Sequence, residues 1–174
     1  MLPFQTESFE IFFQKKLIAP KDLEKRCAAL KKSGKRIATL NGSFDLLHAG
    51  HLEILYQASQ QADLLIVALN SDASIKQYKS PTRPIIPLDG RLRMVAALSF
   101  VDYVTSFEET DPRALLTKIK PDVHVNGAEY GENCIEAETV KQHGGRLHIV
   151  SLVPGLSTSE ILKKIVREER GTCV

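Results

Sequence analysis

The sequence predicts an α/β fold, with a doubly wound parallel sheet of about five strands in a single domain. Two observations predict it. Short apolar runs alternate with longer segments whose apolar residues recur at helical spacing, along most of the 174 residues. The run at 64–69 is apolar at every position, which is typical of a parallel strand covered by helices on both faces. A chain of this length can bury a core without disulfides or metals.

The charge, the cysteines and the apolar stretches of the chain indicate which classes of protein it does not belong to. The net charge of +2 is too small to indicate binding to nucleic acid or to a membrane surface. The three cysteines, Cys27, Cys134 and Cys173, show no framework spacing, so we expect free thiols in a reducing compartment. We find no signal peptide and no apolar stretch near the ~20 residues that a membrane span needs. The sequence therefore predicts a soluble, cytoplasmic protein.

The chain begins with an N-terminal extension, 1–21, before the domain expected over 22–170. The phenylalanines of this extension either pack on the domain or cover a partner subunit, and packing is the favoured interpretation. A helix is expected over 20–33, because Pro20 suits a first turn and Gly34 supplies a stop.

The remaining elements alternate between strand and helix. Ser71 or Asp72 can cap a short helix after the second strand. Asp89 is expected to cap the next helix, and Pro112 lies in the first turn of another. β-Branched and apolar runs predict strands at 36–40, 64–69, 101–105, 122–125 and 146–150, and helical spacing predicts helices at 51–62, 91–99, 135–143 and 160–169.

The segment 77–87 has a different character, because its three prolines fit neither a helix nor a central strand. We expect an ordered but mobile flap that carries Lys79 and Arg83. A plain surface loop with solvated cations is the alternative.

The stretch 40–51, Leu-Asn-Gly-Ser-Phe-Asp-Leu-Leu-His-Ala-Gly-His, lies between the first strand and a helix. Open α/β sheets bind ligands at such strand ends, and helix N-termini favour anions. Gly42 lets the backbone approach a ligand closely. His48 and His51 share one helix face, so both imidazoles can contact one phosphate. A chance surface pair, a helix cap and half of a zinc site are the alternatives. The glycine patterns of NAD enzymes and P-loop NTPases are absent after this strand.

The run His48-Ala49-Gly50-His51, preceded by 42–45, resembles the signature of the HxGH nucleotidyltransferases, which have a Rossmann-like, cytidylyltransferase-like fold. The resemblance implies that both histidines bind the phosphates of a nucleoside triphosphate and offset the charge that builds up during transfer. It also implies that the turn 157–159 grips the triphosphate. The residues alone leave phosphate donation and ordinary helix capping equally open for this turn.

Three sets of candidate site residues follow. The catalytic set is His48, His51 and Lys79. The nucleotide- and phosphate-binding set is Asn41, Gly42, Ser43, Phe44, Gly50, Asn70, Asp72, Arg91, Asn126, Gly127, Glu129, Tyr130, Ser157, Thr158 and Ser159. Acceptor binding is assigned to Asp45 and Arg83, although Asp45 can instead shape the motif loop and Arg91 can instead be a solvated helix-face cation. No protein metal ligand is expected, because Mg²⁺ is often held mainly by substrate phosphates.

Similarity over 22–168 extends the resemblance to the bacterial D-glycero-β-D-manno-heptose 1-phosphate adenylyltransferases. It is carried by 36–51, 70–74, 83–88, 96–98, 101–104 and 157–159. This implies transfer of AMP from ATP to heptose 1-phosphate, giving ADP-heptose and pyrophosphate for lipopolysaccharide core synthesis. A separate sugar kinase and a homodimer are further expectations.

Two positions depart from that family. Asn126 and Glu129 stand where the family usually has lysine and aspartate, so the acceptor specificity can differ. The alternative function is a cytidylyltransferase acting on glycerol 3-phosphate or a similar alcohol phosphate. A non-catalytic nucleotide sensor is the third hypothesis, against which the presence of both histidines and Lys79 speaks.

Overall fold

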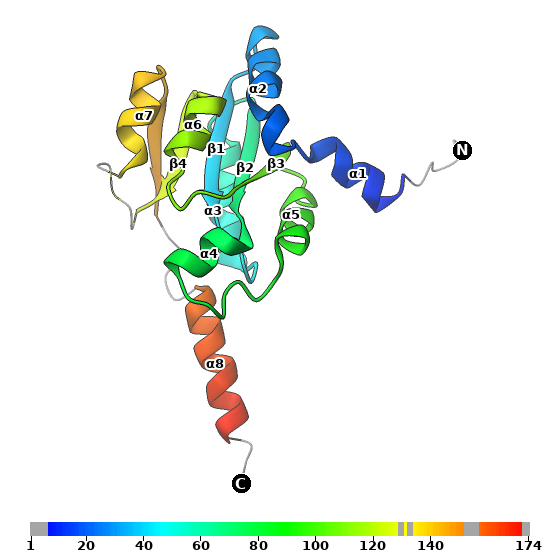
Figure 1. Cartoon of the computed structure of the whole chain (residues 1–174), viewed down its shortest axis with the longest axis vertical. Helices are drawn as coiled ribbons and strands as arrows, with labels where there is room; N and C mark the ends of the chain where they lie inside the picture. Colours follow the sequence, from blue (N-terminus) through cyan, green and yellow to red (C-terminus); the bar gives the residue numbers. More distant parts are fainter. Residues whose placement is uncertain (1–6, 129–130, 132–133, 152–156, 172–174) are drawn as a thin grey trace.

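A computed structural model describes residues 7–128, 131, 134–151 and 157–171. Its centre is a five-stranded parallel sheet in the order β3-β2-β1-β4-β5, which confirms the predicted fold class (Figure 1). The strands are β1 (Ile37–Gly42), β2 (Leu64–Asn70), β3 (Tyr103–Phe107), β4 (Val123–Gly127) and β5 (Arg146–Val150).

The strand order reverses at β1, which pairs with β2 on one side and with β4 on the other. Ile37 is in register with Leu64 of β2, and Ala38 is in register with Val123 of β4. The loops after β1 and β4 lead away from each other, because their crossovers lie on opposite sides. Open α/β sheets bind ligands in the crevice that forms at such a point.

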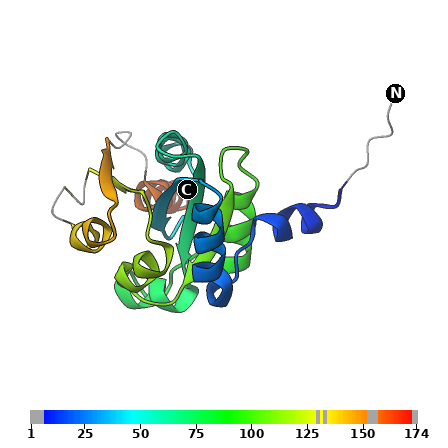
Figure 2. The same cartoon turned by 90° about the horizontal axis from the view of Figure 1, so that it is seen from above.

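Helices cover both faces of the sheet (Figure 2). One face carries α3 (Ala49–Ser59) and α5 (Leu88–Ala96), and the other carries α2 (Leu23–Lys32), α6 (Arg113–Ile119) and α7 (Glu136–Gln142). The other helical elements are α1 (Phe9–Lys16), η1 (Pro20–Asp22), α4 (Asp72–Tyr78) and α8 (Thr158–Gly171). Figure 1 shows α8 extending from the end of the molecule at which α4 also lies. Within the described ranges, no helix is long and apolar enough to cross a membrane.

The alternation of side chains along the central strands produces two apolar cores. Ala38 and Leu40 of β1 belong to the core beneath α3 and α5, whereas Ile37 belongs to the core beneath α2 and α6. Each fully buried Leu, Ile or Val stabilises the fold by about 1.5–3 kcal/mol relative to an exposed position. Cys27 lies in the second core as a free thiol, and Cys134 is also free, while Cys173 lies outside the described residues.

Part of the N-terminal extension packs on the domain. Phe13 of α1 is 2% exposed and joins the core beneath α3 and α5. The Nζ atom of Lys16 donates hydrogen bonds to the carbonyl oxygens of Ala96, Leu98 and Val101, at 2.7–3.0 Å. For these residues the structure therefore agrees with packing on the domain.

Several strands and helices begin or end at residues other than those predicted. The strands β1 and β4 run on through Gly42 and Gly127, because these residues still pair with β2 and β5. The predicted cap at Asp89 is wrong, since Pro87 is the N-cap of α5 and Asp89 lies in its first turn. Pro112 is likewise the N-cap of α6 and not a residue of its first turn.

Candidate active site

A buried phenylalanine shapes the loop after β1. Phe44 is 4% exposed and has a φ of 44°, a left-handed conformation that is unusual for a bulky side chain. A Cβ atom at Gly42 would lie only 3.1 Å from the Phe44 ring, so a larger residue would force the ring to shift by a few tenths of an ångström. The ring contacts His51 edge-on, with 5.4 Å between the centroids. Phe44 thus connects the position of His51 to the core.

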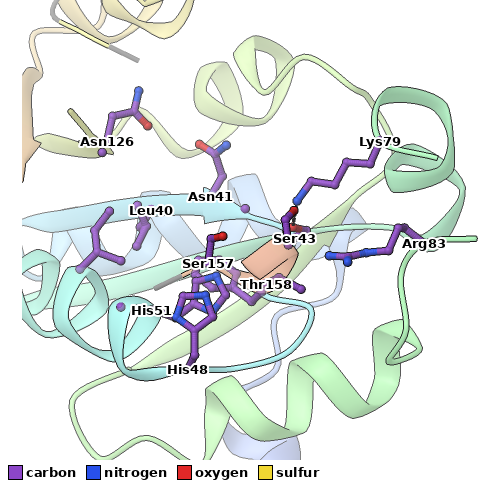
Figure 3. Close-up of a pocket in the computed structure, with 16 residues that line it drawn as sticks. Leu40, Asn41, Ser43, His48, His51, Lys79, Arg83, Asn126, Ser157 and Thr158 are labelled. Atoms are coloured by element: carbon purple, nitrogen blue, oxygen red, sulfur yellow. Dashed lines mark hydrogen bonds between the residues drawn. The ribbon is translucent and has the colours of Figure 1, made fainter. Parts of the chain in front are cut away.

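His48 and His51 face the same space, as the motif predicts. Their rings are stacked with centroids 3.8 Å apart and planes 21° apart. His48 is the N-cap of α3, and its Nδ1 accepts a long hydrogen bond, 3.4 Å, from the backbone N–H of His51. With Nδ1 as acceptor, Nε2 is the N–H donor of the neutral His48 ring. Figure 3 shows both rings beside Ser157 and Thr158.

The surroundings keep both imidazoles neutral near pH 7. Burial, followed by the charges of His48 and Lys79, lowers the pKa of His51 to about 4. Burial also lowers the pKa of His48 below its usual value. A neutral imidazole can donate one hydrogen bond to a phosphate oxygen, and a bound polyanion raises the pKa of any imidazole next to it. The pair is therefore suited to an anionic guest.

A second helix N-terminus reaches the same space. Thr158 begins α8, and the Oγ atom of Ser157 accepts a hydrogen bond from the Glu160 N–H at 3.2 Å. Free N–H groups and the helix dipole make such a terminus favourable for anions. The start of α3 and the start of α8 therefore converge on one cavity from segments about a hundred positions apart in the chain.

This first cavity has a volume of about 270 Å³. Most of the predicted site residues line this cavity, at the carboxyl ends of β1 and β4. They are Asn41, Gly42, Ser43, Phe44, His48, Gly50, His51, Lys79, Arg83, Asn126, Gly127, Ser157, Thr158 and Ser159. Leu40 and Ile54 also line it and were not predicted, since an apolar residue of a strand or helix gives no site signal in the sequence.

Lys79 lies at the edge of this cavity. Its Nζ atom donates a hydrogen bond to Ser43 Oγ at 2.8 Å (Figure 3). Burial, and then the nearby Arg83 guanidinium, lower the pKa of Lys79. A bound phosphate would relieve this repulsion by placing negative charge between the cations.

The segment after α4 is fastened to the motif loop by Asp45. Asp45 is 1% exposed, and its carboxylate accepts hydrogen bonds from the N–H groups of Ile85 and Ile86 at 2.9–3.0 Å. It also forms an ion pair with Arg83, at 2.9 Å from Arg83 Nε. These contacts agree with the order expected of this segment, and Asp45, which was assigned to acceptor binding, shapes the loop and lines neither cavity described here.

Arg91 has a different role from the one predicted. Its side chain is fully buried and donates to the carbonyl oxygens of Ser43, Asn70 and Ile86, at 2.6–2.9 Å. It also donates to Asp72 Oδ1 at 2.7 Å. Arg91 and Asp72 line neither cavity described here. Arg91 therefore connects the motif loop, the end of β2 and the segment before α5, and it is neither a solvated cation nor exposed to a nucleotide.

A second cavity, of about 510 Å³, lies at the end of β1 between residues that follow β2 and residues of β4 and α7. It shares the wall formed by Asn41, Gly42, Ser43, Lys79 and Asn126 with the first cavity. The predicted residue Asn70 lines this one, whereas Glu129 and Tyr130 lie outside the described residues. The prediction missed Tyr78, Thr110, Pro112, Cys134, Ile135 and Glu136, which come from three separate segments.

The charges of the first cavity suit phosphate better than a metal ion. Among the described residues, no group of three or more His, Cys, Asp and Glu could hold a metal. Imidazole, ammonium, hydroxyl and helix N–H groups all donate hydrogen bonds to anions. Two adjacent cavities with a common wall can hold two ligands whose reacting atoms meet at that wall. The arrangement suits group transfer between two phosphorylated molecules.

Comparison with known proteins agrees with this geometry. The cytidylyltransferase-like family matches residues 39–166. The chain is 46% identical over 136 residues to the bifunctional protein HldE of Azotobacter vinelandii, covering 78% of this chain and 29% of that protein. It is 40% identical over 156 residues to the protein of the same name from Shigella sonnei, covering 89% and 33%. The chain thus spans about a third of the length of these relatives.

Two solved structures resemble the fold. A lipopolysaccharide core biosynthesis protein from Thermoplasma volcanium matches with a TM-score of 0.56 and 27% identity, over 69% of this chain and 98% of that one. A pantoate–β-alanine ligase from Francisella tularensis matches with a TM-score of 0.53 and 16% identity, over 87% and 79%, and shows the fold alone. With its motif, its sheet order and a match over most of its length, the chain belongs to the cytidylyltransferase-like family.

Proposed function

We propose that this chain is an adenylyltransferase that transfers AMP from ATP to D-glycero-β-D-manno-heptose 1-phosphate, giving ADP-heptose and pyrophosphate. The observation that carries the proposal is the first cavity, where two imidazoles, Lys79 and two helix N-termini meet at the switch point of the sheet. The resemblance of the sequence to the heptose 1-phosphate adenylyltransferases supports the choice of substrate, and one solved relative is named as a lipopolysaccharide core biosynthesis protein. The product would serve lipopolysaccharide core synthesis in the cytoplasm, and a sugar kinase would supply the acceptor.

The reaction needs positioning and charge stabilisation more than an enzyme nucleophile. An oxygen of the acceptor phosphate attacks the α-phosphorus of ATP. The new P–O bond forms as the bond to the β-phosphate oxygen breaks, and pyrophosphate leaves with that electron pair. Negative charge grows on the α-phosphoryl oxygens and on the leaving group. Donors that are already oriented by the fold stabilise this charge without rearrangement.

The residues take distinct parts in this scheme. His48 and His51 donate to the α- and β-phosphoryl oxygens, and the 157–159 turn binds the outer phosphates at the start of α8. Lys79, on the wall shared by the two cavities, lies where the acceptor phosphate meets the α-phosphorus. Mg²⁺ would arrive on the ATP phosphates and neutralise part of their charge, since the donors of this cavity suit anions and not cations.

The proposal is tested by incubating the protein with ATP, Mg²⁺ and D-glycero-β-D-manno-heptose 1-phosphate and measuring pyrophosphate release. We expect turnover with this pair and little with CTP and glycerol 3-phosphate. The reverse preference would establish the cytidylyltransferase alternative. Tight ATP binding without product, across a panel of phosphate acceptors, would instead identify a nucleotide sensor.

Replacing Lys79 by alanine should lower kcat much more than it weakens ATP binding. The reason is that Lys79 lies at the shared wall, where the charge of both substrates is combined only in the reacting complex. Single-turnover kinetics and calorimetric ATP binding measure the two effects separately. Lys76, an exposed residue of α4, provides the matched lysine control. Equal losses in kcat and ATP affinity would indicate uniform binding instead.

A further inference from the structure

The second cavity contains a carboxylate oxygen that the described residues leave without a hydrogen-bond donor. Glu136, the first residue of α7, lines this cavity and is 5% exposed. Among the residues that the structure describes, none donates a hydrogen bond to its Oε2 atom, which is also buried. Leaving a buried carboxylate oxygen without a hydrogen-bond donor is costly, so such an atom calls for an explanation, and a donor on a ligand supplies one.

The groups around Glu136 are polar but mostly uncharged. Asn126 donates a hydrogen bond from Nδ2 to Cys134 Sγ at 3.3 Å. Burial, and then the Glu136 carboxylate, raise the pKa of the Cys134 thiol, which places the thiol beside the carboxylate. On the far side, the hydroxyl group of Tyr78 donates to Asn70 Oδ1 over a long 3.4 Å. Amide, phenol and carboxylate groups together suit a neutral molecule with several hydroxyl groups.

The positive charge of the second cavity is at one end. Lys79 follows α4, after β2, and Glu136 begins α7, after β4, so the two side chains come from segments on opposite sides of β1 in the strand order. A ligand that is anionic at one end and rich in hydroxyl groups at the other matches this separation of charge. A sugar 1-phosphate has this form, and a short alcohol phosphate has few hydroxyl groups to offer. The cavity volume of about 510 Å³ also exceeds that of the first cavity, about 270 Å³.

We propose that Glu136 accepts hydrogen bonds from hydroxyl groups of the acceptor sugar and thereby selects polyhydroxylated phosphates as acceptors. The inference rests on the proposed function, because it takes the second cavity as the acceptor side of the same reaction. Glu136 contacts the part of the acceptor that does not react. Its effect therefore falls on acceptor binding and not on the binding of ATP.

The test is the variant Glu136→Gln, which keeps the shape of the side chain and removes its charge. We expect KM for D-glycero-β-D-manno-heptose 1-phosphate to rise about tenfold or more, the scale for a hydrogen bond to a charged group. KM for ATP should stay within about twofold. Glu138→Gln, on an exposed position of the same helix, is the matched control and should change neither constant. Circular dichroism melts identify any variant that is misfolded, and Glu136→Asp, which keeps the charge, should recover part of the acceptor affinity.

The outcomes separate this inference from the proposed function. If the wild-type protein makes ADP-heptose and Glu136→Gln leaves the acceptor KM unchanged, the inference is overturned and the proposed function stands. If the wild-type protein makes no ADP-heptose, the proposed function fails. Calorimetric titration of heptose 1-phosphate, in the presence of a non-hydrolysable ATP analogue, then decides the inference. Weaker binding by Glu136→Gln supports it, whereas equal binding or none by the wild-type protein overturns it.

Discussion

Replacing His51 by alanine is expected to lower turnover about 10²–10³-fold, the scale for losing one preoriented donor. The His51 ring is stacked on His48 and contacts Phe44 edge-on, so the fold fixes the position of this donor. With its pKa lowered to about 4, His51 is a neutral donor at pH 7 before ATP arrives. Its loss therefore removes stabilisation of charge that develops mainly in the transition state, and kcat should fall more than ATP affinity.

Rapid-quench kinetics with saturating ATP and acceptor measure this effect. His148→Ala, on β5, removes a partly buried histidine that lines neither cavity, and it should leave turnover nearly unchanged. His48 needs a finer variant, since alanine there also removes the N-cap of α3, at a cost of about 1 kcal/mol. His48→Ser keeps a capping oxygen but no imidazole. Full activity in His48→Ser would show that His48 acts only as a cap.

Replacing Arg91 by alanine should lower the free energy of unfolding by about 3–5 kcal/mol, the scale for truncating a large buried side chain and leaving buried carbonyl groups without donors. The loss leaves three backbone carbonyl oxygens, of Ser43, Asn70 and Ile86, without their donor. Asp72 also loses its partner, although its side chain is 38% exposed and can be hydrated. Most of the cost therefore comes from the carbonyl groups and from the space left in a fully buried position.

Urea unfolding at pH 7 measures this change. Arg93→Ala, two residues further along α5, is the matched control, because its side chain is 30% exposed and its partners Glu10 and Asp89 lie at the surface. Surface ion pairs contribute about 0–1 kcal/mol, so the control should lose little stability. A normal melting curve for Arg91→Ala with reduced ATP affinity would restore the original interpretation of Arg91 as a nucleotide ligand.

The sequence predicts the fold and the first cavity because their signals are local. Alternating apolar runs determine the strands and helices, and the spacing of His48 and His51 places both on one helix turn. The 157–159 turn was assigned to the same site by the resemblance to the nucleotidyltransferases, because the residues alone leave ordinary helix capping equally open. The prediction therefore identified most residues of the first cavity.

The roles that the sequence misses depend on distant contacts. Arg91 looks like any basic residue at the start of a helix, and its partners come from segments between 5 and 48 positions away. Asp45 meets Ile85 across 40 positions, so no spacing reveals the contact. Glu136 reads as an ordinary first-turn acid, and only the placement of α7 beside the end of β4 makes it line a cavity.

The contacts that Asp45 makes with the segment after α4 affect how fast and how tightly the site binds a ligand. Immobilising a backbone costs about 1–2 kcal/mol of conformational entropy per residue. Because Asp45 binds Arg83, Ile85 and Ile86, this conformational entropy is lost when the chain folds and not when a nucleotide binds. For the proposed ATP substrate, we therefore expect an association rate that is limited by diffusion and orientation instead of by loop closure.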